Sequence, residues 1–208
     1  ADPEAIRNAD ALILPGVGAF PSAMQMLHDS GLTGVIREES RKKPFLGICL
    51  GMQLIFEKGY EFEECDGLGL VPGKVEKIEA PGMVIPHMGW NKLEMQHDCP
   101  ILRNLPEESY VYFVHSYQAV VPDEYLAAYV EYGTAKIPAM VYDGKTVYGA
   151  QFHPEKSGEI GLHRQLISRT ATVSACSRAI FPPWKRLPQI TWKRQRASKQ
   201  PVPPGFTW

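Results

Sequence analysis

Residues 44–53 read PFLGICLGMQ and place Cys49 between two glycines, where an apolar run gives way to a helical pattern. A strand that ends in Gly-x-Cys-x-Gly and continues as a helix is typical of the sharp turn that exposes a nucleophile at the edge of a sheet. Free cysteine is also one of the residue types most often buried, so the alternative is a small apolar side chain in an ordinary turn. The interpretation of Cys49 as a nucleophile needs a second residue elsewhere in the chain that can act as its base.

The segments around this turn predict an α/β fold. Residues 9–18, ADALILPGVG, read as a strand ending in a glycine loop, and residues 21–32 follow with the apolar spacing of a helix. Residues 41–60 repeat the order of strand, tight turn and helix. Two such units in succession favour a mostly parallel sheet with helices on both faces. Residues 83–155 contain short strand-like runs separated by Gly, Pro and Asp-Gly, which we expect to add antiparallel strands.

The composition bounds the class of protein. The 208 residues are 44% hydrophobic and 22% charged, with a formal net charge of -1, as in an ordinary globular domain without a bias towards nucleic acid or membrane. The apolar runs are too short to span a bilayer, and no signal segment opens the chain, so we expect a cytoplasmic protein. The four cysteines lie far apart without a Cys-x-x-Cys pair, which suggests neither a zinc site nor a disulfide framework.

The last part of the chain differs from the rest. Residues 166–208 contain eight basic residues and no acidic residue, together with six prolines and three of the four tryptophans. We therefore expect one domain over residues 1–165, followed by a basic tail over residues 166–208 that is non-native or disordered. A basic tail that contacts nucleic acid or an acidic partner is the less favoured alternative.

A base for Cys49 is found in residues 151–158, QFHPEKSG. Pro154 disfavours the helical region for the residue before it, so we expect an extended tripeptide in which His153 and Glu155 share a face. A carboxylate placed there fixes the tautomer of the imidazole, which can then take the thiol proton of Cys49. A His-x-Glu pair in a solvated loop is common, so this signal gains its weight from the cysteine turn in the same chain.

Four stretches in this order resemble the class I glutamine amidotransferases: PGVGAF (15–20), PFLGICLGMQ (44–53), HSYQAV (115–120) and QFHPEKSG (151–158). With IPHMGWN (85–91) and YVYFVHSY (110–117), they resemble the glutaminase subunits of imidazole glycerol phosphate synthases, which serve histidine biosynthesis. The resemblance implies a flavodoxin-like sheet and the hydrolysis of L-glutamine to glutamate and ammonia. It implies no cofactor and no metal, and a separate (β/α)8-barrel cyclase subunit as the partner in a heterodimer.

The resemblance also implies roles for individual residues. The triad is Cys49, His153 and Glu155. Backbone N–H groups in the oxyanion hole come from Val17 or Gly18 together with Leu50. Glutamine is held by Gly18, Gln53, Ser116 and Tyr117. The subunit interface is formed by Trp90, Asn91, Tyr112 and Lys156.

The chain departs from this family at both ends. Members begin with an additional strand, helix and strand that include a YGMGN-like stretch, whereas this chain opens at ADPEAIRNAD, so we expect the N-terminal βαβ portion to be missing. After residue 165 the basic tail stands where the family has an apolar helix. The alternatives are therefore another class I amidotransferase, a γ-glutamyl thiol hydrolase with a similar triad, or an inactive fragment that binds a partner.

Overall fold

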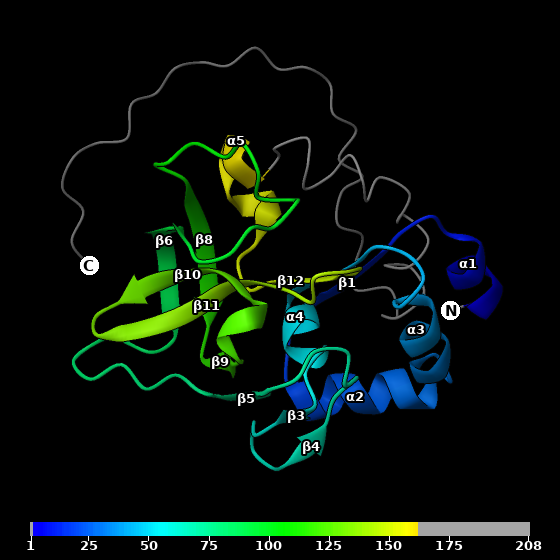
Figure 1. Cartoon of the computed structure of the whole chain (residues 1–208). Coiled ribbons are helices and arrows are strands. Elements are labelled where there is room, and N and C mark those ends of the chain that lie inside the picture. Colours follow the sequence, from blue (N-terminus) through cyan, green and yellow to red (C-terminus); the bar gives the residue numbers. More distant parts are fainter. Residues whose placement is uncertain (1, 162–208) are drawn as a thin grey trace.

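The computed structural model describes residues 2–161 and arranges them around a six-stranded sheet (Figure 1). The basic tail expected over residues 166–208 lies outside the described residues. In chain order, the elements are α1 (Pro3–Asn8), β1 (Leu12–Gly16), α2 (Phe20–Asp29), α3 (Thr33–Glu39), β2 (Phe45–Cys49), α4 (Leu50–Leu54), β3 (Lys58–Gly59), β4 (Cys65–Asp66), β5 (Lys74–Lys77), β6 (His87–Lys92), β7 (Glu94–Met95), β8 (Tyr110–His115), β9 (Tyr117–Val120), η1 (Asp123–Tyr125), β10 (Leu126–Tyr132), β11 (Ala135–Tyr142), β12 (Val147–Ala150), η2 (Pro154–Lys156) and α5 (Gly158–Gly161).

The central sheet is mixed, so the expectation of a mostly parallel sheet was wrong, while the antiparallel strands expected within residues 83–155 are confirmed. Its strand order is β1-β2-β12-β11-β10-β7. Only β1, β2 and β12 run parallel to one another, while β11, β10 and β7 join by antiparallel pairings. The reason lies in the connections, because a two-residue turn joins β10 to β11 and leaves no room for a crossover helix. Asp143 closes the next turn, where its side chain accepts hydrogen bonds from the backbone of Lys145, Thr146 and Val147.

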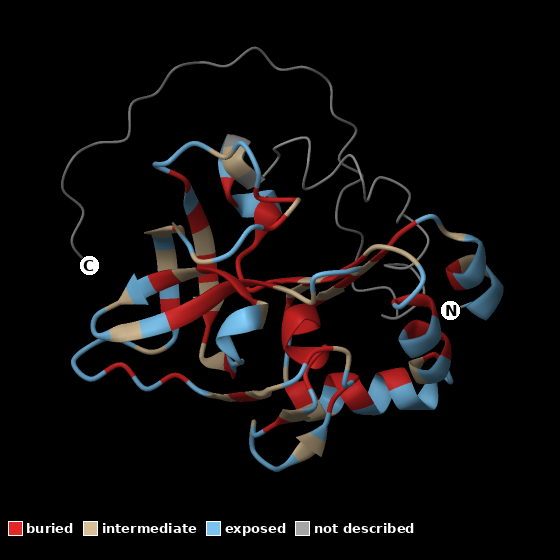
Figure 2. Ribbon diagram, viewed as in Figure 1, coloured by how far each residue is buried: buried red, intermediate tan, exposed pale blue. Residues whose placement is uncertain are grey.

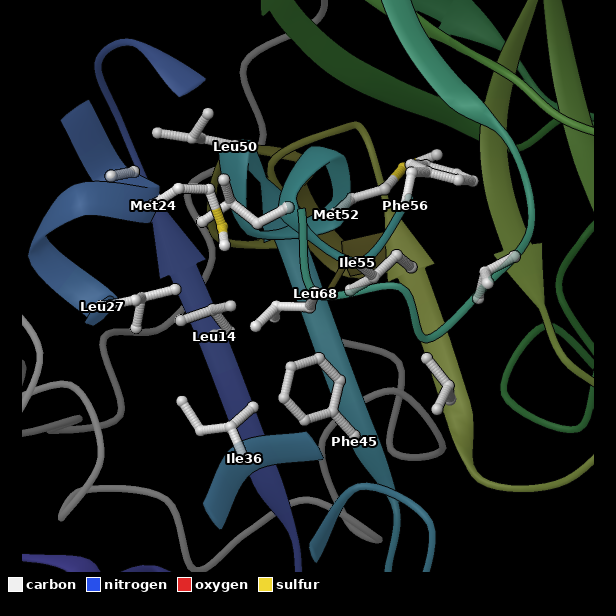
Figure 3. Packing of buried hydrophobic residues seen from close by; sticks show 14 of the residues in the cluster. Leu14, Met24, Leu27, Ile36, Phe45, Leu50, Met52, Ile55, Phe56 and Leu68 are labelled. Atoms are coloured by element: carbon white, nitrogen blue, oxygen red, sulfur yellow. The ribbon is translucent and has the colours of Figure 1, made fainter. Parts of the chain in front are cut away.

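The sheet separates two apolar clusters, and the helices are unevenly divided between them. Alternate residues of β1 and β2 point to opposite faces: Leu12 and Phe45 belong to one cluster, and Leu46 belongs to the other. Residues of α1, α2, α3 and α4 pack in the first cluster. Figure 3 shows those of α2, α3 and α4 around Leu14 of β1 and Phe45 of β2. Strands β6 and β8 cover the second face, where α5 is the only described helix. Within residues 2–161, helices therefore lie on both faces, as expected from the sequence, but four are on the first face and only the short α5 is on the second.

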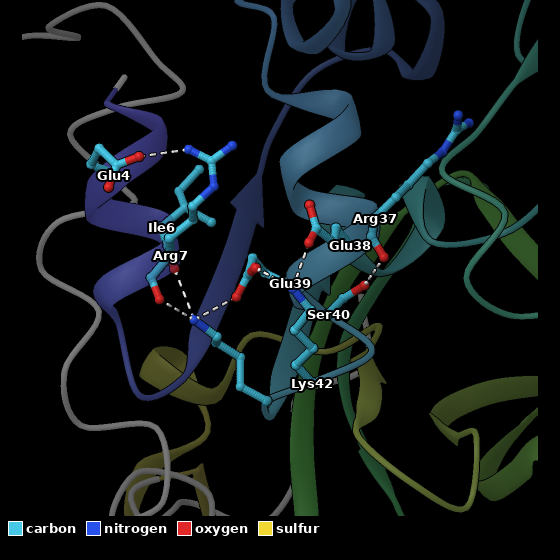
Figure 4. Close-up of polar contacts among 9 residues, drawn as sticks. Glu4, Ile6, Arg7, Arg37, Glu38, Glu39, Ser40 and Lys42 are labelled. Carbon is cyan, nitrogen blue, oxygen red and sulfur yellow. Dashed lines mark hydrogen bonds and ion pairs between the residues drawn. The ribbon is translucent and has the colours of Figure 1, made fainter.

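The short helix α1 is fastened to α3 by polar contacts (Figure 4). The amine of Lys43, just after α3, donates to the carbonyl oxygens of Ile6 and Arg7 at 3.1 and 2.7 Å. These carbonyls lie at the end of α1, where they lack helical partners. Glu39 of α3 is buried and pairs with the same amine at 2.8 Å. The carboxylate of Glu39 therefore neutralises the charge of the lysine that holds the end of α1. Figure 2 shows that buried residues line the sheet between these helices and β8.

Candidate active site

Cys49 ends β2 and begins the turn into α4, as the sequence predicts. Its backbone has φ 52° and ψ -113°, a conformation that residues other than glycine rarely adopt. Such strain persists only where the surroundings enforce it, and it is common at functional sites. The side chain is 8% exposed, so the sulfur is nearly enclosed while it stands at the carboxyl edge of the parallel strands.

Two glycines let the turn pack against its neighbours. A Cβ on Gly47 would lie 2.4 Å from the carbonyl oxygen of Gly51, and a Cβ on Gly51 would lie 1.7 Å from the carbonyl oxygen of Leu14 in β1. Both separations are far inside van der Waals contact with backbone atoms that have no freedom to move. The Gly-x-Cys-x-Gly pattern is therefore a steric requirement of this turn.

The register of the sheet brings the glycine loop of residues 15–18 beside the cysteine. β1 and β2 are parallel, and Gly16 is paired with Cys49. Val17 and Gly18 follow at once; the Val17 side chain is 76% exposed, and Gly18 has φ +106°, a value that favours glycine. Leu50 is the first residue of α4, where backbone N–H groups have no intrahelical acceptor. The three residues expected to form an oxyanion hole therefore lie on segments adjacent to Cys49.

The same register brings His153 to this edge of the sheet. β12 is parallel to β2, and Ala150 is paired with Ile48, so the chain leaves both strands at the same level. His153 bonds to Glu155 through Nδ1, 2.8 Å from Oε1. The predicted contact is confirmed, but the geometry differs from the expected extended tripeptide, because Pro154–Lys156 form a 3-10 turn.

The electrostatics of the pair favour a protonated imidazole. Proximity to the Cys49 thiol, and then the bond to Glu155, raise the pKa of His153 to about 9 against the opposing effect of burial. Burial, the largest single influence, raises the pKa of the Glu155 carboxyl, but the hydrogen bond from His153, a backbone hydrogen bond and the nearby charges of His153 and Lys156 together leave that pKa lowered. Nε2 of His153 is buried and has no hydrogen-bond partner among the described residues. This nitrogen is therefore available to exchange a proton with the thiol.

Ser157 holds the histidine in place, a role that sequence reasoning missed. Its hydroxyl donates to the carbonyl oxygen of His153 at 2.7 Å and accepts from the backbone N–H of Tyr112 in β8 at 3.0 Å. The N–H of His153 donates in turn to the carbonyl of Tyr112 at 2.9 Å. The side chain of Ser157 is 4% exposed, which makes these bonds part of the interior. A serine three residues after the His153-Pro154 pair is the only signal that the sequence offers for this role.

A buried amide pair lies beside the cysteine. Gln53 of α4 donates through Nε2 to the carbonyl oxygen of Tyr117 at 3.1 Å and to Oε1 of Gln151 at 3.0 Å. Gln151 donates through Nε2 to Sγ of Cys49 at 3.8 Å. The structure thus brings Gln53 and Tyr117, both expected to hold a substrate, into contact with each other. Ser116 is the residue before Tyr117, and its carbonyl accepts from Ile78.

Two buried histidines lie behind this pair. His115 of β8 bonds through Nδ1 to the carbonyl oxygen of Tyr117 at 2.8 Å, and its Nε2 lies 2.9 Å from Nδ1 of His87. Burial lowers the pKa of His115 to about 4, so this ring is neutral near pH 7. Nε2 of His87 lies 2.8 Å from the side-chain oxygen of Asn91. Asn91 is therefore tied to the inner side of β6.

The outer side of β6 and β8 carries an exposed aromatic surface. Trp90 and Tyr112 are cross-strand partners whose rings meet edge to face at 4.7 Å, and Trp90 is 61% exposed. Lys156, next to Glu155, places its amine 5.4 Å from the centre of the Tyr112 ring. Three of the four residues expected at a subunit interface thus form one surface, which we call the Trp90 surface. Asn91 points to the opposite side of β6.

Residues 2–161 contain no cluster of three or more His, Cys, Asp or Glu side chains that could hold a metal ion. Within the same range, no helix is long and apolar enough to cross a membrane. The three cysteines in this part of the chain, Cys49, Cys65 and Cys99, are free.

Comparison with known proteins decides the family. The model of the family described as glutamine amidotransferase class-I matches residues 2–168. The chain belongs to the class I glutamine amidotransferase family. The resemblance inferred from the sequence motifs is therefore confirmed, together with the α/β fold class.

Relatives of this amidotransferase include two proteins named imidazole glycerol phosphate synthase subunit HisH. The one from Lactococcus lactis subsp. lactis is 57% identical over 162 residues, which cover 77% of this chain and 79% of the relative. The one from Streptococcus sanguinis is 54% identical over 164 residues, which cover 78% of each. A crystal structure described as a glutamine amidotransferase has the same fold, with a TM-score of 0.60 and 21% identity, and the match covers 81% of this chain and 82% of that one.

Proposed function

We propose that this chain is the glutaminase subunit of an imidazole glycerol phosphate synthase and acts in histidine biosynthesis. The observation that carries the proposal is the pairing of a strained Cys49 with a hydrogen-bonded His153–Glu155 pair, in a chain 57% identical to a HisH subunit. The amidotransferase domain would occupy residues 1–165, a range that agrees with the family match over residues 2–168.

In the proposed reaction, Nε2 of His153 takes the thiol proton, and Sγ of Cys49 attacks the side-chain carbonyl carbon of L-glutamine. Collapse of the tetrahedral intermediate breaks the carbon–nitrogen bond, and His153 returns the proton to the leaving nitrogen as ammonia departs. Water, deprotonated by the same imidazole, then attacks the γ-glutamyl thioester and releases glutamate and the thiol. Glu155 holds Nδ1 of the ring throughout and stabilises its cation.

The oxyanion of both tetrahedral intermediates would be stabilised by backbone N–H groups of Leu50 and of Val17 or Gly18. N–H groups at the start of a helix are suited to this, because they are unpaired and aligned with the positive end of its dipole. Gly18, Gln53, Ser116 and Tyr117 would hold the amino and carboxylate groups of glutamine. Gln53 is 5% exposed and uses its amide nitrogen for Tyr117 and Gln151, which leaves its oxygen for the substrate amine.

Ammonia would pass to a (β/α)8-barrel cyclase subunit that makes imidazole glycerol phosphate and AICAR. The Trp90 surface is the proposed docking site, since exposed aromatic rings and a lysine form a surface to which a partner could bind. It also adjoins the triad, because Lys156 directly follows Glu155. Asn91 would support this surface from behind through His87.

The test is the Cys49→Ala substitution, assayed with the cyclase subunit present. We expect glutamine-dependent synthesis of imidazole glycerol phosphate to be abolished and ammonia-dependent synthesis to remain, because added ammonia bypasses the thioester. Cys65→Ala is the matched control, since Cys65 is a free thiol away from the turn and should retain both activities. Equal loss of both activities in Cys49→Ala would make Cys49 a structural residue. Glutaminase activity that never depends on the cyclase would favour a free γ-glutamyl hydrolase.

A further inference from the structure

Gln151 is a fully buried polar residue to which the proposed mechanism gives no part. It follows β12 directly, and its backbone N–H donates to the carbonyl oxygen of Ala139 in β11 at 2.9 Å. The position of its backbone is thus fixed by the sheet and does not depend on its side chain. Both ends of its side-chain amide are engaged, one with Gln53 and the other with Cys49.

The hydrogen bonds decide which end of each amide faces which partner. The carbonyl oxygen of Tyr117 can only accept, so the group of Gln53 that faces it is the amide nitrogen. The same nitrogen supplies its second hydrogen to Gln151, so Gln151 presents its oxygen to Gln53. The amide nitrogen of Gln151 is then left facing the sulfur of Cys49 at 3.8 Å. A backbone carbonyl therefore sets the orientation of a donor aimed at the nucleophile.

We propose that Gln151 is a further catalytic residue, whose side-chain N–H donates to the sulfur of Cys49 and stabilises the thiolate. The inference rests on the proposed function, in which that thiolate attacks glutamine and later leaves the thioester. A donor to sulfur favours the charged form over the neutral thiol, since hydrogen bonds to ions are the stronger ones. It acts at both steps, because sulfur carries the charge before attack and regains it when the thioester breaks.

The groups that face the sulfur have separate roles in this arrangement. His153 approaches from the segment after β12 and exchanges the proton, with Glu155 behind it. Gln151 approaches from the end of β12 itself and carries no charge at any pH at which the protein is folded. It supplies a fixed N–H dipole without accepting or releasing a proton. The hydrogen bond from Gln53 prevents the side-chain amide from rotating by 180°.

The test measures the reactivity of the thiol directly. The rate at which iodoacetamide alkylates Cys49 is followed from pH 5 to 10 by mass spectrometry of the peptide containing it, because only the thiolate reacts. In Gln151→Glu an oxygen can still accept from Gln53, and the ionised carboxylate replaces the donor facing sulfur by an acceptor. Gln151→Met removes both bonds at nearly the same volume. Gln118→Met, in β9, is the control, since its buried oxygen has no partner among the described residues.

We expect the midpoint of the alkylation profile to rise by about one pH unit in Gln151→Met and by more in Gln151→Glu, while Gln118→Met matches the wild type. An unchanged midpoint in Gln151→Met, which has no donor in any protonation state, in protein that melts like the wild type, would overturn the proposal. The readout needs neither glutamine nor the cyclase. Wild-type protein that alkylates as expected but makes no product with the cyclase would contradict the proposed function and leave the role of Gln151 standing.

Discussion

Gly51 lies against Leu14 so closely that a Cβ on the glycine would sit 1.7 Å from the leucine carbonyl oxygen. The contact joins the start of α4 to the middle of β1 and sets how near the nucleophile turn lies to the glycine loop. Because β1 and β2 are paired from Leu12 to Gly16, neither strand can move aside without breaking the ladder. The turn at Cys49 and the sheet are therefore built as one unit.

Gly51→Ala should abolish the native fold of this region, because a methyl group cannot share the position of a backbone oxygen. We expect a loss of several kcal/mol in the free energy of unfolding, seen as insoluble protein or a collapsed thermal transition. Gly34→Ala in α3 is the matched control, since nothing lies within 4 Å of the place that its methyl group would take, and alanine favours a helix. Normal melting of Gly51→Ala would show that β1 and α4 are not fixed as described.

The triad should also leave a signature in the pH dependence of stability. The pKa of His153 is about 9 in the folded protein and near 6.5 as an unperturbed group, so folding binds a proton between these values. Its stabilising effect is complete below pH 6.5 and is lost as the pH rises through 9. The Glu155→Gln substitution removes the carboxylate, which is one of the two groups that raise the pKa of His153. The decline in unfolding free energy from pH 7 to 9 should therefore be shallower in this variant. Urea unfolding at a series of pH values measures this; parallel curves for the two proteins would contradict it.

Ser157 should matter for both stability and activity. Ser157→Ala removes two buried hydrogen bonds and leaves the N–H of Tyr112 without its acceptor, which should cost about 1–3 kcal/mol in urea unfolding. Because the carbonyl of His153 is released, we also expect slower turnover of glutamine with little change in its KM. Ser157→Thr keeps the hydroxyl and should restore part of both. A loss of stability with full turnover would limit Ser157 to a structural role.

The Trp90 surface should be needed for the cyclase to stimulate glutaminase activity. We expect Trp90→Ala and Lys156→Ala to leave Cys49 open to labelling by an electrophilic glutamine analogue, because neither residue contacts the triad sulfur. The stimulation of glutaminase by saturating cyclase should fall. Met26→Ala, an exposed apolar residue of α2, serves as the control. The measurement compares glutaminase rates with and without partner, and unchanged stimulation in both variants would remove these residues from the coupling.

Much of the site could be predicted from local sequence. Cys49 between two glycines, and His153 followed by Pro154 and Glu155, are short patterns whose geometry depends on a few backbone angles. Backbone sterics act over neighbouring residues, so the cysteine turn could be predicted locally, whereas the His153–Glu155 pattern gained its weight from that turn and its expected extended shape is a 3-10 turn in the structure. The order of the motifs along the chain was sufficient to indicate the family.

The tertiary structure alone decided how many strands are antiparallel and which partners the buried amides have. Antiparallel strands were expected in residues 83–155, but which of them join the central sheet depends on which segments pair, and the hairpin from β10 to β11 made that sheet mixed where a mostly parallel one was expected. Gln151 lies 98 residues from Gln53 and 102 from Cys49, and no local pattern connects them. Asn91 and Trp90 are neighbours in sequence but face opposite sides of β6. A hydrogen bond or an exposed surface is made by residues that packing brings together, and packing is a property of the whole chain.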